Sequence, residues 1–313
     1  MAERWLLADF GGTHTRAGLA ENGRLAAQSV TRFRNDGFDG PQALLHAYLA
    51  DQGSPAITAI CAGVAGPVRY GIAQLTNHRW QVNGAALAAD LGARSCHLLN
   101  DLQAQAYALD DLPDTAITPL FPGTPPPPGA TRLVMGMGTG SNVAVAHRIG
   151  PDLFVPPAES GHAGLPFASG IQADLLAWLE TLHTHNPMEK ALSGPGLSNI
   201  HRFVTGRSLT PRDILAAYDA DDADAARTLR LFVQLLGQVA GDLALAHLPM
   251  GGVFFIGGLA RAVAPLLAPL GFLDRFTAKG PYTPILQDIP VSLITDDTAA
   301  LLGCARALRQ RTL

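Results

Sequence analysis

The sequence predicts an α/β fold built from two similar halves, and three observations support this prediction. Short apolar strands alternate with helical segments along most of the chain. A strand–glycine turn–strand pattern at residues 5–20 returns at residues 131–148, about 125 residues later. Polar residues follow strands at four places, where open α/β sheets bind ligands. We therefore expect two related domains that face each other across a ligand cleft.

Length and composition agree with two domains of ordinary size. The chain has 313 residues, of which 48% are hydrophobic and 15% are charged, as in a globular protein with a large core. The formal net charge of −4 gives no electrostatic support for binding to nucleic acid or to an anionic membrane. The first ten residues are too short and too acidic for a signal peptide, and we expect no apolar run of 18 residues elsewhere.

The three cysteines, Cys61, Cys96 and Cys304, each stand alone in apolar sequence. This isolation argues against a disulfide framework and against a structural zinc site. We expect three buried, unreactive thiols and a cytoplasmic protein.

The first elements form a meander around a glycine turn. Asn22-Gly23 is a strong hairpin signal, because both residues accept the left-handed backbone of a tight turn. Gly11 and Gly12 give a permissive turn that a ligand can approach closely. The predicted strands cover residues 6–9, 15–20 and 25–33.

The chemistry of this first turn favours a phosphate group. The carboxylate of Asp9 lies beside Gly11, Gly12 and Thr13, and N–H and hydroxyl donors next to a carboxylate suit a nucleotide phosphate with its Mg²⁺. An ordinary hairpin with an acidic turn has the same pattern. The motif is neither a Walker loop nor a dinucleotide fingerprint, because a strand follows the glycines where those motifs begin a helix.

The remainder of the first half alternates between helices and strands. Asn100 and Asp101 directly follow one of these strands, so they are expected at a strand end where ligands bind. Helices are predicted at residues 40–52, 84–91 and 103–109, strands at 57–64 and 96–99, and a short extended piece at 74–80.

A proline-rich segment at residues 110–129 separates the halves and is predicted to be a surface loop. The second half then starts with the glycine turn 136–140. Gly257-Gly258 stands where a strand turns into a helix that could receive an adenosine group. The predicted strands are 131–136, 143–148, 250–256 and 291–295, and the predicted helices are 171–183, 228–248 and 298–310.

Seven motifs spread over nearly the whole chain carry a resemblance to a known family. They are DFGGT at 9–13, LTNHRW at 75–80, LLNDLQA at 98–104, GMGTG at 136–140, PAESGH at 157–162, LSGPGL at 192–197 and GGVFFIGGLA at 251–260. With this set the sequence resembles the bacterial glucokinase family of the actin/hexokinase/Hsp70 superfamily.

The resemblance implies a two-domain actin/hexokinase-like (ribonuclease H-like) fold with the ligand cleft between the domains. It implies a small domain of residues 1–111 plus 296–313, to which the final helix returns, and a large domain of residues 112–295. It also implies ATP-dependent phosphorylation of glucose at its 6-hydroxyl with Mg²⁺, and a homodimer.

The matching positions give each candidate residue a role. Asp101 matches the general base, and a carboxylate at a strand end can accept a hydroxyl proton. The implied glucose ligands are Asn100, Asp101, Glu159, His162 and Glu189. The implied nucleotide-binding residues are Asp9, Gly11, Gly12, Thr13, Gly138, Thr139, Gly140, Gly257 and Gly258.

No dedicated protein site for a metal is expected; Mg²⁺ would come bound to ATP, near Asp9. Glu159 and His162 have the i, i+3 spacing of some metal sites, but no second such pair occurs.

The chain departs from the family pattern at several positions. His14 stands where the family has Asn, Ser141-Asn142 where it has Leu-Gly, Ser160 where it has Gly, and DTAA at 297–300 where it has DNPG. A titratable ring at His14 could alter nucleotide affinity. These changes leave open a kinase for another hexose or an N-acetylated amino sugar, and a non-catalytic sugar-binding regulator.

Overall fold

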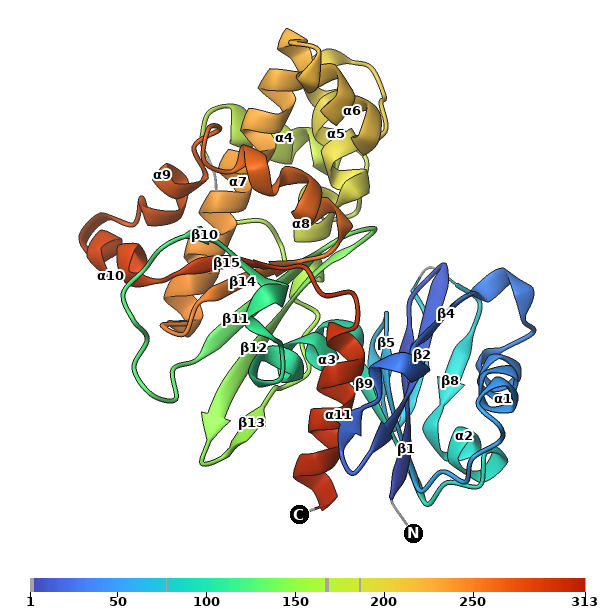
Figure 1. Cartoon of the computed structure of the whole chain (residues 1–313). Coiled ribbons are helices and arrows are strands. Elements are labelled where there is room, and N and C mark those ends of the chain that lie inside the picture. Colours follow the sequence, from blue (N-terminus) through green and yellow to red (C-terminus); the bar gives the residue numbers. More distant parts are fainter. Residues whose placement is uncertain (1–2, 77, 167–168, 186, 313) are drawn as a thin grey trace. The chain divides into compact units, whose positions relative to one another are not determined.

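The computed structural model describes residues 3–76, 78–166, 169–185 and 187–312 (Figure 1). This part of the chain divides into two compact units. Unit 1 comprises residues 1–116, 148–157 and 296–313, and unit 2 comprises residues 117–147 and 158–295. Both units combine a twisted sheet with helices, so the prediction of an α/β fold is confirmed.

The sheet of unit 1 has the strand order β3-β2-β1-β5-β9, with β4 also paired to β2. The pair β1–β2 is antiparallel, whereas β1–β5 and β5–β9 are parallel. The strands are β1 (Arg4–Phe10), β2 (His14–Glu21), β3 (Arg24–Leu25), β4 (Thr31–Arg34), β5 (Ala59–Val64) and β9 (Ser95–Asn100).

The prediction of one continuous strand over residues 25–33 is wrong. A 3₁₀ turn at Ala27–Ser29 separates β3 from β4. The Ser29 hydroxyl accepts a hydrogen bond from the backbone N–H of Leu19 at 2.8 Å and donates one to the carbonyl of Ala26 at 2.6 Å. A buried side chain therefore replaces the backbone partner that a continuous strand would have supplied.

The helices of unit 1 are α1 (Pro41–Asp51), α2 (Gly84–Asp90), α3 (Asp101–Tyr107) and α11 (Ala299–Thr312). A Cβ atom on Gly303 would lie 1.7 Å from the carbonyl oxygen of Ala104, so α11 crosses α3 in direct backbone contact. A small second sheet contains β6 (Val68–Arg69), β7 (Ile72–Gln74) and β8 (Gln81–Asn83). The extended piece predicted at 74–80 is mainly the turn between β7 and β8, and its Asn77 lies outside the described residues.

Two thiols of unit 1, those of Cys96 and Cys304, are held in their protonated form. Cys61 and Cys304 are buried, and Cys96 is partly buried. A hydrogen bond with Cys61, together with burial, raises the pKa of Cys304. Burial raises the pKa of Cys96 to about 12. A neutral thiol is a poor nucleophile, so Cys96 and Cys304 have the unreactive character expected from the sequence.

The sheet of unit 2 repeats the arrangement of unit 1. The pair β11–β12 is antiparallel, and β11–β14 and β14–β15 are parallel, in the order β10-β15-β14-β11-β12. The strands are β10 (Ile117–Phe121), β11 (Arg132–Met137), β12 (Ser141–Ile149), β14 (Val253–Ile256) and β15 (Val291–Ile294). Strand β10 falls inside the segment predicted as a loop. Proline is tolerated there because β10 is an edge strand, and its register shifts between Pro119 and Phe121.

The helices of unit 2 are α4 (Ile171–Glu180), α5 (Gly194–Thr205), α6 (Pro211–Asp219), α7 (Ala223–His247), α8 (Gly258–Val263), α9 (Phe272–Thr277) and α10 (Thr283–Asp288). Among the described residues, α7 is the one helix whose length and apolar composition would fit a membrane span. However, 61% of its most apolar window is buried, and its side chains form much of the core of unit 2.

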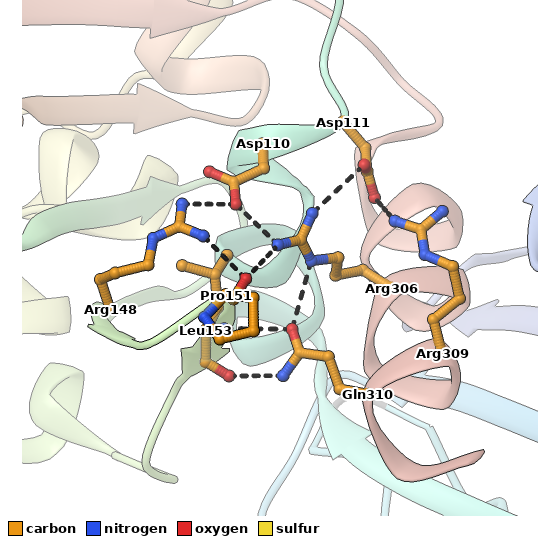
Figure 2. A network of polar contacts seen from close by, with 8 residues as sticks. All are labelled: Asp110, Asp111, Arg148, Pro151, Leu153, Arg306, Arg309 and Gln310. Carbon is orange, nitrogen blue, oxygen red and sulfur yellow. Dashed lines mark hydrogen bonds and ion pairs between the residues drawn. The ribbon is translucent and has the colours of Figure 1, made fainter. Parts of the chain in front are cut away.

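A cluster of charged side chains joins three segments of unit 1 (Figure 2). The Asp110 carboxylate accepts hydrogen bonds from Arg148 at 2.6 Å and from Arg306 at 2.8 Å. Asp111 pairs with Arg306 at 3.5 Å and with Arg309. Strand β13 (Asp152–Phe154) lies beside this cluster, where the amide of Gln310 on α11 bonds both backbone groups of Leu153. The cluster therefore fixes residues 148–157 to α11.

Candidate active site

The glycine turn after β1 is tight because its backbone bonds to itself. The N–H of Gly11 donates to the carbonyl of His14 at 3.0 Å. A Cβ atom on Gly11 would lie 2.9 Å from that same oxygen, so a side chain would force the turn apart. Thr13 is exposed beside the turn.

The side chain of Asn35 hydrogen-bonds the backbone of this turn. This role was not predicted from the sequence. The side-chain amide of Asn35 donates to the carbonyls of Gly11 at 2.8 Å and Gly12 at 3.1 Å, and its oxygen accepts from the Thr15 hydroxyl at 2.8 Å. Asn35 is only 1% exposed. An Asn in the fragment RNDG looks like ordinary turn chemistry, so the sequence alone contains no signal for this role.

Asp9 lies near the end of β1, close to the guanidinium of Arg16 at 3.6 Å. Burial raises the pKa of Asp9 to about 6, and the neighbouring Arg16 opposes that rise. Arg16 also approaches Asp297 at 3.7 Å. One guanidinium thus lies near two carboxylates at this end of β1.

Asn100 and Asp101 lie at the junction of β9 and α3. Asn100 is the N-cap of α3: its side chain accepts from the N–H of Leu102 at 3.0 Å, and Gln103 completes a capping box. The Asn100 amide also donates to the carbonyl of Gly66 at 3.3 Å. Asp101 is the first residue of the helix, and its carboxylate accepts from the N–H of Leu102 at 2.8 Å. The capping box fixes the backbone at the first turn of α3 and therefore the backbone position of Asp101.

The register of the parallel strands brings Asp9 and Asp101 to one edge of the sheet. Gly63 on β5 pairs with Asp9 on β1 and with Leu99 on β9. A Cβ atom on Gly63 would lie 3.5 Å from the Cα of Asp101 and 3.8 Å from a carboxylate oxygen of Asp9. The two acidic residues therefore flank a glycine at which a Cβ atom would also come within 3.2 Å of the Ala104 side chain, so the backbone is closely packed here.

His14, a departure from the family pattern, opens β2 opposite Arg34. Partial desolvation and the charges of Arg32, Arg34 and Arg16 hold the pKa of His14 below its ordinary value, and Asp36 opposes this. The imidazole is therefore mainly neutral at physiological pH, and no extra charge is added beside the glycine turn.

In unit 2 the second glycine turn joins β11 to β12 and is braced by two other glycines. The N–H of Gly138 donates to the carbonyl of Gly140 at 2.9 Å, and the N–H of Gly194 donates to the carbonyl of Gly138 at 2.8 Å. Gly257 has φ of +111°, and a Cβ atom there would lie 2.3 Å from the carbonyl oxygen of Met137. The positive φ of Gly257 would strain any other residue, and the contact with Met137 leaves no room for a side chain.

A cavity of about 1190 Å³ opens beside this turn, wholly within unit 2. Gly138, Thr139 and Gly258 line it, so three predicted nucleotide-binding residues share one cavity. Sequence reasoning missed its other wall, formed by α5 and α6 and the segment between them. Residues from that wall include Pro195, Ser198, Leu209, Thr210, Arg212 and Leu215.

Ser141, which follows the glycine turn, is 7% exposed, and its hydroxyl has no hydrogen-bond partner among the described residues. A buried hydroxyl without a protein partner is uncommon and needs a reason, such as a ligand atom. It is another residue that the sequence did not single out for a role.

The predicted sugar ligands of unit 2 lie in adjacent turns. Glu159 is the N-cap of a 3₁₀ turn at Ser160–His162 and His162 is its last residue, whereas Glu189 lies in a second turn at Met188–Lys190. The two turns are joined by the bond from the N–H of Met188 to the carbonyl of Ala163 at 2.9 Å. A Cβ atom on Gly140 would lie 2.9 Å from a carboxylate oxygen of Glu189, so these turns border the glycine turn.

Desolvation raises the pKa of Glu159; the charge of His162 lowers it, and Glu189 raises it further. Glu189 has a counter-ion in Lys190 at 3.4 Å. Two carboxylates and an imidazole placed within one another's fields can accept and donate hydrogen bonds to vicinal hydroxyls. In the described part of the chain, no group of three or more His, Cys, Asp or Glu side chains is arranged to hold a metal ion.

The predicted site residues therefore fall into separate groups. Asp9, Gly11, Gly12, Thr13, Asn100 and Asp101 belong to unit 1. The remaining eight, namely Gly138, Thr139, Gly140, Glu159, His162, Glu189, Gly257 and Gly258, belong to unit 2. Neither Gly140 nor Gly257 lines the cavity; Gly257 packs against β11.

Two α/β sheets, each beginning with strand–glycine turn–strand, are the architecture of the actin/hexokinase-like class of proteins. A family model described as Glucokinase matches residues 6–311. The glucokinase of Yersinia enterocolitica is 32% identical over 98% of this chain and 96% of its own. The chain belongs to the glucokinase family and is an enzyme of the sugar kinase class.

Solved structures share the fold of this chain. A glucokinase from an Antarctic psychrotroph has a TM-score of 0.86 and 28% identity, over 98% of this chain and 99% of its own. A ROK family glucokinase from Streptomyces griseus, in complex with glucose and AMPPNP, has a TM-score of 0.66 and 18% identity, over 99% of this chain and 100% of its own. The predicted actin/hexokinase-like fold is confirmed.

Proposed function

We propose that this enzyme transfers the γ-phosphoryl group of ATP to the 6-hydroxyl of glucose. The observation that carries the proposal is the position of Asp101 at the capped start of α3, across Gly63 from Asp9. A fixed carboxylate at a strand end can take the hydroxyl proton and orient the oxygen for in-line attack on the γ-phosphorus. Asp101 is therefore proposed as the general base.

The nucleotide is proposed to bind through both glycine turns. The cavity of about 1190 Å³ is large enough for a nucleoside, and Gly138, Thr139 and Gly258 line it. Gly140 and Gly257 shape the same turn, and Gly11, Gly12 and Thr13 offer donors to phosphate oxygens. Mg²⁺ would arrive with ATP and lie near the carboxylate of Asp9. The Streptomyces griseus enzyme, which binds AMPPNP, supports ATP as the donor.

The hexose is proposed to bind Asn100, Asp101, Glu159, His162 and Glu189. These residues provide carboxylate, amide and imidazole groups, which suit several vicinal hydroxyls of one sugar. Glucose is favoured because the relatives are glucokinases and the Streptomyces griseus structure contains glucose. We also propose a small domain of residues 1–111 plus 296–313 and a large domain of residues 112–295. A homodimer and a cytoplasmic location are likewise part of the proposal.

The test is a steady-state comparison of kcat/KM with Mg-ATP for glucose, mannose, fructose and N-acetylated hexosamines. Glucose is expected to give the highest value. A higher value for another sugar would change the proposed substrate, whereas measurable glucose binding without ADP release from any sugar would favour a non-catalytic regulator.

A further inference from the structure

The start of β12 is tied to the turn that carries Glu159 and His162. A Cβ atom on Gly161 would lie 1.6 Å from the carbonyl oxygen of Ser141, so the turn rests directly on the strand backbone. The side chain of Asn142 strengthens this contact from the neighbouring position. Both segments belong to unit 2.

Asn142 uses both ends of its side-chain amide. Its oxygen accepts from its neighbour Val143 N–H at 2.8 Å and from the Gly161 N–H at 3.3 Å. Its nitrogen donates to the carbonyl of Ala158 at 2.9 Å and to a carboxylate oxygen of Glu159 at 3.3 Å. The amide therefore contacts the chain on both sides of Glu159 and the Glu159 carboxylate itself.

We propose that Asn142 is a positioning residue for sugar recognition, which holds the Glu159 carboxylate ionised and aimed through its side-chain N–H₂. The inference rests on the proposed function, because it takes Glu159 as a sugar ligand. A donor that bonds the ionised form of a carboxylate favours that form, and an ionised Glu159 accepts hydrogen bonds from sugar hydroxyls.

The charged surroundings of Glu159 make this donor important. His162 lies on the same turn and favours the ionised carboxylate, whereas Glu189 on the facing turn opposes it. Glu189 is itself paired with Lys190 at 3.4 Å. Desolvation also favours the neutral form of Glu159, and the charge of His162 counters it. The Asn142 amide donates directly to the carboxylate at 3.3 Å, and a donor at this place favours the ionised form.

Two variants separate positioning of Glu159 from plain support of the backbone. Asn142→Asp keeps the oxygen that accepts from Val143 and Gly161 and removes both donors, whereas Asn142→Ala removes all four contacts. If Asn142 only supports the backbone, the Asn142→Asp variant should keep the wild-type KM for glucose and the Asn142→Ala variant should not. If it positions Glu159, Asp is at least as harmful as Ala, because it places a second carboxylate beside the first.

The experiment measures the KM values for glucose and Mg-ATP, and kcat/KM for glucose against pH, in the wild type and both variants. We expect the glucose KM to rise about tenfold in both variants, with a much smaller change in the Mg-ATP KM. In Asn142→Asp the acidic limb of kcat/KM for glucose should move to higher pH, by about one unit, because the new carboxylate raises the pKa of Glu159.

Thr283→Ala is the matched control, since it removes one side-chain bond to the backbone, from Thr283 to the Thr277 carbonyl at 2.7 Å, in the same unit. It should leave the glucose KM and the acidic limb unchanged. An active wild type whose Asn142→Asp variant keeps the wild-type glucose KM and pH profile would overturn the inference and leave the proposed function standing. A wild type that phosphorylates no hexose would overturn both.

Discussion

At the scale of single residues, the ionised form of Asp9 destabilises the folded chain. The pKa of Asp9 is about 6 in the folded chain and 3.8 in an unfolded reference. Between these values the folded chain binds more protons than the unfolded chain, so the stability that Asp9 contributes falls as pH rises from about 4 to about 6. Above about pH 6 the full free-energy cost of burying the ionised Asp9 carboxylate is present. Such a cost is typical of a group kept for function.

Asp9→Asn removes this charge. We expect the free energy of unfolding at pH 7.5 to rise by about 1–3 kcal/mol, while kcat/KM for Mg-ATP falls strongly because the carboxylate proposed to lie nearest the metal is lost. In the wild type, kcat/KM for Mg-ATP should fall as pH drops through about 6. Denaturant unfolding and initial rates check both effects. A variant that is less stable than the wild type and equally active would contradict this role.

Candidate roles could be assigned from the sequence only where a motif surrounds the residue. Asp9, Asp101 and the glycines stand inside recognisable motifs, so the resemblance suggested a role for each. Asn35 and Ser141 have no such signal, because a turn asparagine and a strand serine are ordinary in sequence. Their importance appears only when distant segments pack: Asn35 reaches Gly11 across 24 positions of sequence.

At the scale of elements, the junction between β11 and β14 depends on a glycine with no room for a side chain. Gly257→Ala should destabilise unit 2 by about 2–3 kcal/mol, because the new methyl group would meet the Met137 carbonyl and strain a positive φ. Gly258→Ala is the matched control, since a Cβ atom there has no neighbour within 4 Å. Thermal unfolding of the two variants gives the comparison; equal midpoints would show that the close contact does not constrain the fold.

The first glycine turn depends in the same way on Asn35. Asn35→Ala should raise the KM for Mg-ATP and lower stability by about 1–3 kcal/mol, because the carbonyls of Gly11 and Gly12 lose their buried donor. Asn83→Ala, which removes the N-cap of α2 in the same unit, should lower stability without changing that KM. A similar KM in both variants would refute the assigned role of Asn35.

Elements with a strong apolar period were predicted well, and those set by context were not. The strands β1, β5 and β9 and the helix α7 lie within a few residues of their predicted limits, because burial imposes the period. Helices α5 and α6 were missed: each begins with a capping residue and an early proline, at Ser193-Gly194-Pro195 and Thr210-Pro211, in sequence that looks like a loop.

At the scale of the whole chain, the cluster of Asp110, Asp111, Arg148, Arg306 and Arg309 joins segments far apart in sequence (Figure 2). Asp110→Asn should destabilise unit 1 by about 1–3 kcal/mol, because Arg148 and Arg306 would keep their charges in a mostly buried place without that carboxylate. Asp36→Asn, which breaks the exposed pair with Arg34, should leave the unfolding midpoint unchanged. Equal shifts of the unfolding midpoint in the two variants would show that the cluster stabilises unit 1 no more than the exposed pair does.

The repeat of strand–glycine turn–strand made the two-sheet architecture predictable from sequence. The cluster was not predictable, since it depends on which arginine of the last helix meets which aspartate after α3. Charged residues on a helix and in a loop read as solvated surface until the segments are packed.

The central claim is that Asp101 is the general base of a glucose kinase. The most direct test compares Asp101→Asn with the wild type in two measurements, kcat for glucose with Mg-ATP and the Kd for glucose from calorimetric titration. We predict that kcat falls by about 10²–10⁴-fold while the Kd changes only a few-fold, since the amide keeps the size of the side chain but cannot take the proton. A variant that phosphorylates glucose at close to the wild-type rate would contradict the account.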